Sequence, residues 1–300
     1  SQTGAPVSCL GSFWSLIELI RLSESPPVVV VHGFGVSMWI TFLRLLSAHR
    51  ASVIWVQNGF HFRNGRIKSK IQSLLQKSVD GFLTNSHAVA KSIRGARIES
   101  ARVWILTSGL GTEWFTRPRE VIDGPILMVG NYLPEKNFLG AVDAYVRSNV
   151  MRPLHIFTNN DSSLLRHLTG IEEATASRIS VFTGVRATPS LYDSYSVLLH
   201  PSLSEGRPRV VLEALSRGLL VVGGDTGDIP TMVAHNHRGI VVNPLSIEEI
   251  ANALEQTDAR IVGGEMGNAS KIKSLTDYHR EFENLLAELV TLKTDEGTKV

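Results

Sequence analysis

The sequence predicts an α/β protein with two doubly wound parallel sheets. The chain has 300 residues, which is enough for two domains. In the second half, apolar segments expected to be strands alternate with helical segments, and they lie near 126–130, 154–158, 179–183, 197–200, 219–222 and 239–242. The first half repeats this alternation between residues 28 and 106. Each half is therefore expected to form its own sheet.

The composition is that of a globular protein. Hydrophobic residues make up 43% of the chain and charged residues 19%, which excludes a disordered chain. Cys9 is the single cysteine, so no intramolecular disulfide can form, and no Cys/His cluster has the spacing of a zinc site. No apolar run is long enough to span a bilayer. The sequence starts without Met, so the lack of a signal peptide indicates little.

Charge is distributed unevenly along the chain. Residues 1–119 hold 14 Lys and Arg against 5 Asp and Glu, whereas residues 120–300 hold 16 against 23. The whole chain carries a formal charge of +2. The positive excess of the first half indicates that an anionic partner would bind there.

The first half opens with predicted helices and strands in alternation. Ser12–Leu22 has the apolar spacing of an amphipathic helix, and Val28–Val31 predicts a buried strand. Ser52–Val56 predicts the next strand, which leads into Asn58 and His61. His61 lies between two phenylalanines, so packing against them and contact with a ligand both remain open.

A basic amphipathic helix is predicted from Arg66 to Lys77. Its cationic residues are Arg66, Lys68, Lys70 and Lys77. Its apolar stripe consists of Ile67, Ile71, Leu74 and Leu75. Such a helix can lie on an anionic membrane surface. Its stripe can equally face the core of the domain.

Two further strands are predicted in the first half, Asp80–Thr84 and Arg102–Leu106. Asn85 and Ser86 follow the first of them and are expected to cap the next helix, because their side chains accept hydrogen bonds from free helix N–H groups.

Three parts of the chain are predicted from these patterns. Residues 1–117 form the N-terminal domain, and a linker rich in charge and containing Pro118 follows. Residues 118–274 form the second domain. Residues 275–300 contain a helix with an apolar face that includes Phe282 and Leu285.

The stretch 196–224 predicts a βαβ unit with two notable carboxylates. Val197–His200 reads as a strand, and Pro208 suits the first position of the following helix. Glu205 lies in the loop between them, and Glu213 follows inside the helix. Ligands of open parallel sheets bind beyond the carboxyl ends of the strands, so sugar hydroxyls could meet both carboxylates there. A solvated loop glutamate and a solvated helix glutamate are the plainer interpretation.

The loop, the E-x7-E spacing, the helix and the following strand together resemble the donor-binding motif of family-4 glycosyltransferases, which have the GT-B fold. The version here reads SEGRPRVVLEAL. The resemblance implies two Rossmann-like doubly wound domains facing a cleft, and a C-terminal helix, within 275–300, that crosses back to the N-terminal domain. It also implies a shortened N-terminal domain, because the family's first strand has no counterpart in the sequence. Glu205 would bind the donor sugar and Glu213 the nucleotide ribose.

A second turn resembles the family's diphosphate clamp. Gly130, Asn131 and Lys136 lie in a turn where the family places an Arg and a Lys against the donor diphosphate. Lys136 matches, whereas Asn131 replaces the Arg. Negative charge builds on the diphosphate as it leaves, so a cation is needed there. Arg207 or Arg209 could supply it, and both could instead be solvated.

Two other sites are implied by the resemblance. Gly184, Val185 and Arg186 match the turn that meets the nucleobase. In many family members a His follows the second strand of the first domain and contacts the donor or the acceptor. Asn58 stands at that position here and His61 three residues later, so either could take the role.

The implied reaction is transfer of a sugar from a nucleoside diphosphate sugar, a UDP- or GDP-sugar, to an acceptor hydroxyl with retention at the anomeric carbon. No cofactor and no metal are expected. The expected acceptor is a glycan or a lipid-linked molecule, and nucleic acid is not an expected partner. The expected location is the cytoplasm, with the inner face of the membrane as a further option. The alternative is a non-catalytic protein of the same fold that binds sugar nucleotides.

Overall fold

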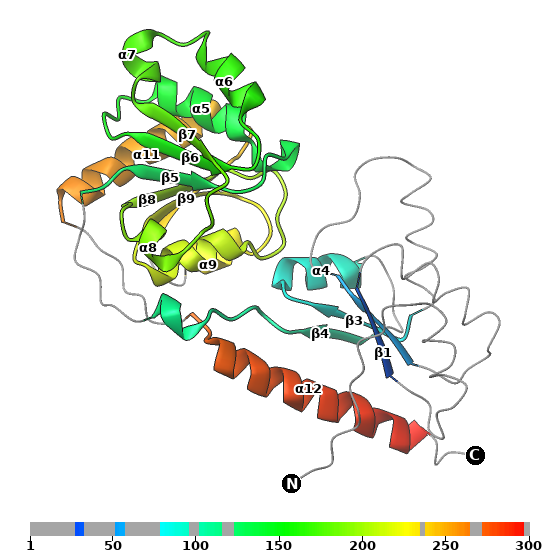
Figure 1. Ribbon diagram of the computed structural model, residues 1–300. Helices are drawn as coiled ribbons and strands as arrows, with labels where there is room; N and C mark the ends of the chain where they lie inside the picture. Colours follow the sequence, from blue (N-terminus) through cyan, green and yellow to red (C-terminus); the bar gives the residue numbers. More distant parts are fainter. Residues whose placement is uncertain are drawn as a thin grey trace, which may run out of the picture.

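The computed structural model describes residues 28–32, 52–57, 79–95, 102–115, 123–234, 238–264 and 272–296. These residues form two separate parallel sheets with helices around them (Figure 1). The predicted helices Ser12–Leu22 and Arg66–Lys77, and the candidate residues Asn58 and His61, lie outside the described residues.

The first sheet has the strand order β1-β2-β3-β4, and every neighbouring pair is parallel. Its strands and its described helix are β1 (Val28–His32), β2 (Ser52–Val56), β3 (Gly81–Thr84), α4 (His87–Gly95) and β4 (Arg102–Ile105). Ser86 caps α4 as predicted, because its Oγ accepts a hydrogen bond of 3.1 Å from the amide of Val89.

The second sheet has six parallel strands in the order β10-β9-β8-β5-β6-β7. The strands are β5 (Ile126–Val129), β6 (Leu154–Thr158), β7 (Ile179–Thr183), β8 (Val197–His200), β9 (Leu220–Gly224) and β10 (Gly239–Val242). Four of these strands have the predicted bounds, and β5 and β9 differ by one or two residues. Buried parallel strands are nearly continuous apolar runs, which explains why the sequence locates them well.

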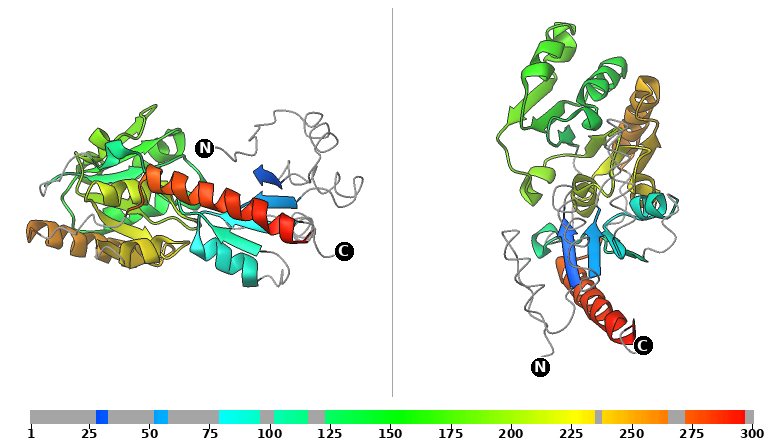
Figure 2. Two further views of the ribbon diagram at one scale, coloured as in Figure 1. Left: turned by 90° about the horizontal axis from the view of Figure 1, so that it is seen from below. Right: turned by 90° about the vertical axis from the view of Figure 1, so that its right-hand side faces the viewer.

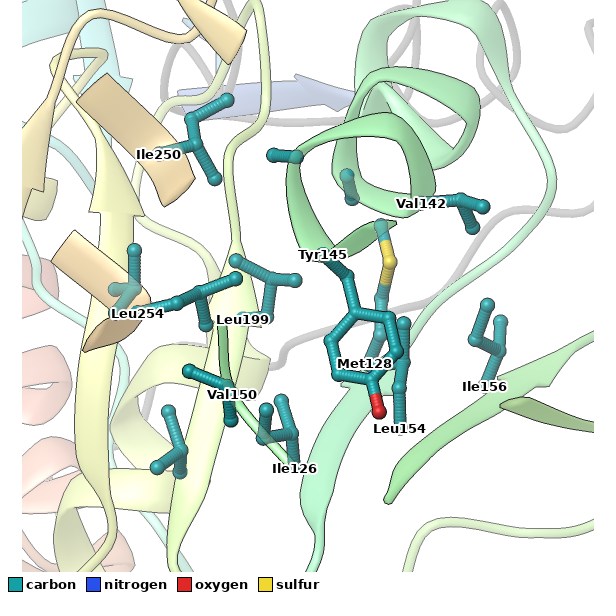
Figure 3. Close-up of a cluster of buried hydrophobic side chains, with 14 of the residues drawn as sticks. Ile126, Met128, Val142, Tyr145, Val150, Leu154, Ile156, Leu199, Ile250 and Leu254 are labelled. Atoms are coloured by element: carbon teal, nitrogen blue, oxygen red, sulfur yellow. The ribbon is translucent and has the colours of Figure 1, made fainter. Parts of the chain in front are cut away.

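Helices cover both faces of this sheet. They are α5 (Phe138–Arg147), α6 (Ser162–Leu168), α7 (Glu173–Ala176), α8 (Pro189–Tyr192), α9 (Arg209–Ser216), α10 (Ile229–Ala234) and α11 (Ile247–Val262). Successive side chains of β5 point to opposite faces, so Ile126 and Met128 pack in the cluster of α5, α6 and α11, whereas Leu127 packs in the cluster of α8, α9 and α10. Figure 3 shows the first cluster, with Tyr145 of α5 over Met128.

The long helix α12 (Leu275–Glu296) lies along the first sheet although it comes last in the chain (Figure 2). Leu285 is buried together with Ile54, Leu83 and Leu106 of the first domain. None of the helices in the described part of the chain combines the length and the apolar character needed to cross a bilayer.

Candidate functional site

The second sheet has a topological switch point between β5 and β8. These strands are parallel neighbours, with Ile126 opposite Val197, yet the helices that follow them pack on opposite faces. The loops that follow the two strands therefore meet beyond their carboxyl ends, which is where open α/β sheets bind ligands. Two hydrogen bonds of 2.7 Å join the loops, from the Leu203 amide and the Ser202 hydroxyl to the Glu135 carbonyl.

Lys136 and Glu205 come together at this switch point. Lys136 ends a short 3-10 turn after β5, and its Nζ lies 2.6 Å from Oε1 of Glu205, in the loop after β8. His200, the last residue of β8, places its Nε2 2.8 Å from the same oxygen. The Glu205 side chain is only 9% exposed. Two positively polarised donors thus share one oxygen of a buried carboxylate.

This environment keeps Glu205 ionised. Burial alone raises the pKa of a carboxyl group, but the hydrogen bond and charge of His200 and then of Lys136 outweigh it and hold the pKa of Glu205 at about 2. An ionised carboxylate accepts hydrogen bonds and donates none, so the site presents a permanent acceptor. Sugar hydroxyls are donors that such an acceptor binds.

Asn137 fixes the end of the Lys136 turn. Its backbone has a φ of 55°, in the left-handed region that asparagine tolerates better than most residues. Its side-chain amide donates to the carbonyls of Pro201 and Pro244 at 3.2 and 2.7 Å. Asn131, which stands where the resemblance expects a clamp arginine, is exposed in the same loop after Gly130.

Glu213 is buried in α9 and is held by both of its oxygens. Arg209 Nε donates to Oε1 at 2.8 Å, and the Tyr192 hydroxyl donates to Oε2 at 2.8 Å. Burial and the Glu213 carboxylate raise the pKa of Tyr192, so its hydroxyl stays a donor. Pro208 is the residue that precedes α9, one position earlier than the first helical position predicted.

Asp228 connects the loops at the switch point to the first domain. Its carboxylate accepts hydrogen bonds from the Ser86 hydroxyl at 3.0 Å and from the His87 and Ala88 amides at 3.1 and 2.9 Å. Arg207 Nη1 lies 3.3 Å from it. Arg207 and Arg209 are thus both paired with carboxylates in this structure, Asp228 and Glu213 respectively.

Gly227 lies directly against the Glu205 loop. Its φ is +58°, and a Cβ there would overlap the carbonyl oxygens of Glu205 and Gly206. The Asp228 amide donates to the Gly206 carbonyl at 2.8 Å. The loop 225–228 and the Glu205 loop are therefore packed backbone to backbone.

The predicted site residues fall into two groups in the structure. Lys136, Glu205, Arg207, Pro208, Arg209 and Glu213 lie on the loops and helix around the switch point, as do Gly130 and Asn131. Gly184, Val185 and Arg186 follow β7 at the sheet edge and are exposed.

Sequence reasoning missed His200 and Tyr192, and it did not anticipate the contacts of Asp228. A histidine that ends an otherwise apolar strand, as His200 does after Val197, Leu198 and Leu199, was the one available signal. The partners of Tyr192 and Asp228 depend on tertiary packing alone.

The chain resembles known proteins both in sequence and in fold. Residues 124–257 match the family described as Glycosyl transferases group 1. Sucrose-phosphate synthase from Thermosynechococcus elongatus superposes with a TM-score of 0.74 at 13% identity, covering 93% of this chain and 77% of that chain. Anabaena HepE in complex with UDP gives a TM-score of 0.72 at 14% identity, covering 92% of this chain and 81% of that chain. The fold is GT-B.

The GT-B fold confirms the predicted fold class. A lipopolysaccharide outer core galactosyltransferase, WaaB, also matches, with a TM-score of 0.67 at 16% identity over 92% of this chain and 78% of that chain. Among curated proteins, the sulfoquinovosyl transferase SQD2 of Arabidopsis thaliana is 24% identical over 251 residues, which is 77% of this chain. The chain spans 48% of the length of that relative.

Proposed function

We propose that this GT-B chain is a retaining glycosyltransferase that moves a sugar from a nucleoside diphosphate sugar to an acceptor hydroxyl. The observation that carries the proposal is the meeting of Lys136 and Glu205 at the switch point, 2.6 Å apart, within the segment that matches the glycosyltransferase family. A cation for a diphosphate and a permanent acceptor for sugar hydroxyls are the two groups that such a donor needs side by side.

The donor would lie across the carboxyl ends of β5 and β8. Lys136 would contact the diphosphate, and the free amides at the start of α9 would add partial positive charge. Glu213 would bind the ribose, and Glu205 the sugar. The base would lie toward Gly184–Arg186. The UDP complex of HepE makes a UDP-sugar the first donor to test.

The chemistry of transfer needs no covalent enzyme intermediate in this proposal. The bond from the anomeric carbon to the diphosphate oxygen breaks, and the acceptor oxygen bonds to the same face of that carbon. The acceptor's proton passes to the departing phosphate oxygen, which Lys136 stabilises as negative charge develops. No cofactor or metal has a role in this proposal. Asn58 and His61, outside the described residues, would act on the acceptor side.

The acceptor is proposed to be a glycan or a lipid-linked molecule that meets the basic first domain. The positive excess of residues 1–119 supports an anionic surface as the place of reaction, on the cytoplasmic side of a membrane. The similarity to a lipopolysaccharide outer core galactosyltransferase points in the same direction.

A non-catalytic sugar-nucleotide-binding protein is the second candidate. The observation in its favour is Asn131, which stands where the family resemblance expects a clamp cation and is exposed. The two candidates predict different fates for a bound donor, because only the enzyme would break its glycosidic bond.

A two-step experiment tests the proposal. Thermal shift with UDP, GDP and their sugars first identifies the nucleotide, since a ligand that binds only the folded state raises its stability. Proton NMR then follows the best donor with and without EDTA. With water as the acceptor, release of the nucleoside diphosphate is expected in both samples, and the earliest spectra should show the freed sugar with unchanged anomeric configuration, before it mutarotates. Stabilisation without any donor cleavage would favour the binding protein, and no stabilisation by any nucleotide would refute both.

A further inference from the structure

His200 occupies an unusual position for a polar side chain. It ends β8, whose other residues are Val197, Leu198 and Leu199, and it is 2% exposed. An apolar residue would satisfy that burial at lower cost, because a buried polar group has to find a hydrogen-bond partner. The partner here is Oε1 of Glu205, 2.8 Å from Nε2.

Glu205 is held through one oxygen only. Oε1 accepts from both His200 and Lys136, whereas Oε2 makes no hydrogen bond to any other residue of the described part of the chain. This arrangement fixes the direction of the carboxylate and leaves Oε2 available to a donor group such as a sugar hydroxyl.

The two donors differ in how freely they can move. Lys136 is at the end of a flexible stem and its side chain is 22% exposed, whereas the His200 side chain is 3% exposed. A diphosphate that enters the switch point attracts the Lys136 ammonium and competes with Glu205 for it. His200 is buried and cannot follow, so it remains on Oε1.

From this contrast we infer that His200 is a positioning residue, which keeps Glu205 directed at the donor sugar when Lys136 turns to the diphosphate. The inference rests on the proposed function, and it assigns His200 a role in binding the donor sugar. Without His200, a nucleotide sugar that draws Lys136 away would leave Oε1 of the buried Glu205 carboxylate without a hydrogen-bond donor, which is costly. The effect of His200 on donor binding therefore passes through Glu205.

The proton on His200 has to be on Nε2. The Glu205 carboxylate is ionised and can only accept, so the nitrogen that faces it must donate. Nitrogen-15 NMR of the ligand-free protein can check this contact without any nucleotide. The His200 signal, assigned by its loss in His200→Gln, should show a protonated Nε2 that shifts in Glu205→Gln.

The decisive experiment is a double-mutant cycle read by calorimetry with UDP and UDP-glucose. His200→Leu should weaken UDP-glucose by about tenfold, as the loss of a hydrogen bond to a charged group does. His200→Gln, which can donate from a similar place, should stay within about threefold of wild type. In the Glu205→Ala background, His200→Leu should change the affinity by less than about twofold.

The control is His155→Leu. His155 lies near the start of β6, away from the switch point, and its Nδ1 lies 3.1 Å from the Tyr195 hydroxyl. This variant should bind UDP-glucose like wild type.

Three results would overturn the role of His200: an unchanged affinity in His200→Leu, an equal loss in the Glu205→Ala background, or an Nε2 without a proton. A wild-type protein that binds neither UDP nor UDP-glucose would instead overturn the proposed use of these donors, and the nitrogen spectrum would still show whether His200 holds Glu205.

Discussion

Ser86 and Asp228 lie 142 residues apart in the chain and join the two domains by a side-chain hydrogen bond of 3.0 Å. The Asp228 carboxylate also accepts the first free amides of α4, so it lies at the positive end of that helix. Asp228 is 1% exposed, and its charge is compensated from both domains, by α4 and by Arg207. The contact between the domains thus includes a buried ion pair.

Removal of Asp228 should destabilise the chain. Asp228→Ala leaves Arg207 without its carboxylate and two α4 amides without an acceptor, so we expect a loss of about 3 kcal/mol in the free energy of unfolding. Urea denaturation measures this loss. Asp225→Ala, an exposed aspartate of the same loop, is the matched control and should cost less than about 0.5 kcal/mol. Equal stability of the two variants would contradict the role of the buried contact.

Glu205 should stabilise the fold in a pH-dependent way. Its pKa falls from 4.5 to about 2, which corresponds to about 3 kcal/mol because each pKa unit is worth about 1.4 kcal/mol. The folded pKa is the lower one, so this stability is present above about pH 5 and is lost as the pH falls toward 2.

Urea denaturation of wild type and Glu205→Gln between pH 7 and pH 3 tests this expectation. The stability advantage of wild type should shrink steadily below pH 5. Glu135→Gln, an exposed glutamate of the neighbouring loop, should show little advantage at any pH. A difference that does not depend on pH would show that Glu205 is not held as an ion.

Lys136 should be required for diphosphate binding. Lys136→Met keeps most of the stem and removes the charge, and a charge-assisted contact is worth about 1.5–3 kcal/mol, so UDP should bind at least about tenfold more weakly. Calorimetry measures the affinity, and Lys273→Met, whose lysine pairs with Glu281, serves as control. Wild-type affinity and turnover in Lys136→Met would remove Lys136 from the clamp.

The two glutamates should divide the donor between them. Glu213→Gln keeps an acceptor oxygen for Tyr192 but weakens the ribose contact, so UDP and UDP-glucose should both lose about tenfold in affinity. Glu205→Ala should leave UDP within about threefold of wild type and abolish sugar transfer. Calorimetry with UDP alone compares the variants, and equal losses would refute the division.

The predicted helix Arg66–Lys77 should attach the first domain to anionic vesicles. Each cation near such a surface is worth about 1 kcal/mol, so changing Arg66, Lys68 and Lys70 to Gln should reduce co-sedimentation strongly, as should added salt. Exposed Lys91 and Arg94 of α4 changed to Gln form the control. Absence of binding at low salt would favour the alternative in which the apolar stripe faces the core.

The sequence predicts the second domain far better than it predicts the site within it. Strands such as β8 are apolar runs whose burial is a local property, and the loop that follows each strand is located with them. The sequence could predict that Lys136 and Glu205 lie near each other, because the loops that carry them follow neighbouring strands, but it could not predict that their side chains pair. His200 pairs with Glu205, and Tyr192 pairs with Glu213. These pairs depend on side-chain packing in the folded chain, which no local sequence pattern reveals.

Because Gly227 has no side chain, the backbone of its loop packs directly against the backbone of the Glu205 loop, and this packing couples the two domains. The backbone on one side of Gly227 carries Asp228, which touches the first domain, and the backbone that it presses against carries Glu205. A motion that draws α4 away from Asp228 therefore has to disturb the peptide groups next to Glu205. By thermodynamic reciprocity, if a ligand bound at the Glu205 loop changes the free energy of this contact between the domains, a molecule that binds at the contact changes the affinity for that ligand by the same factor.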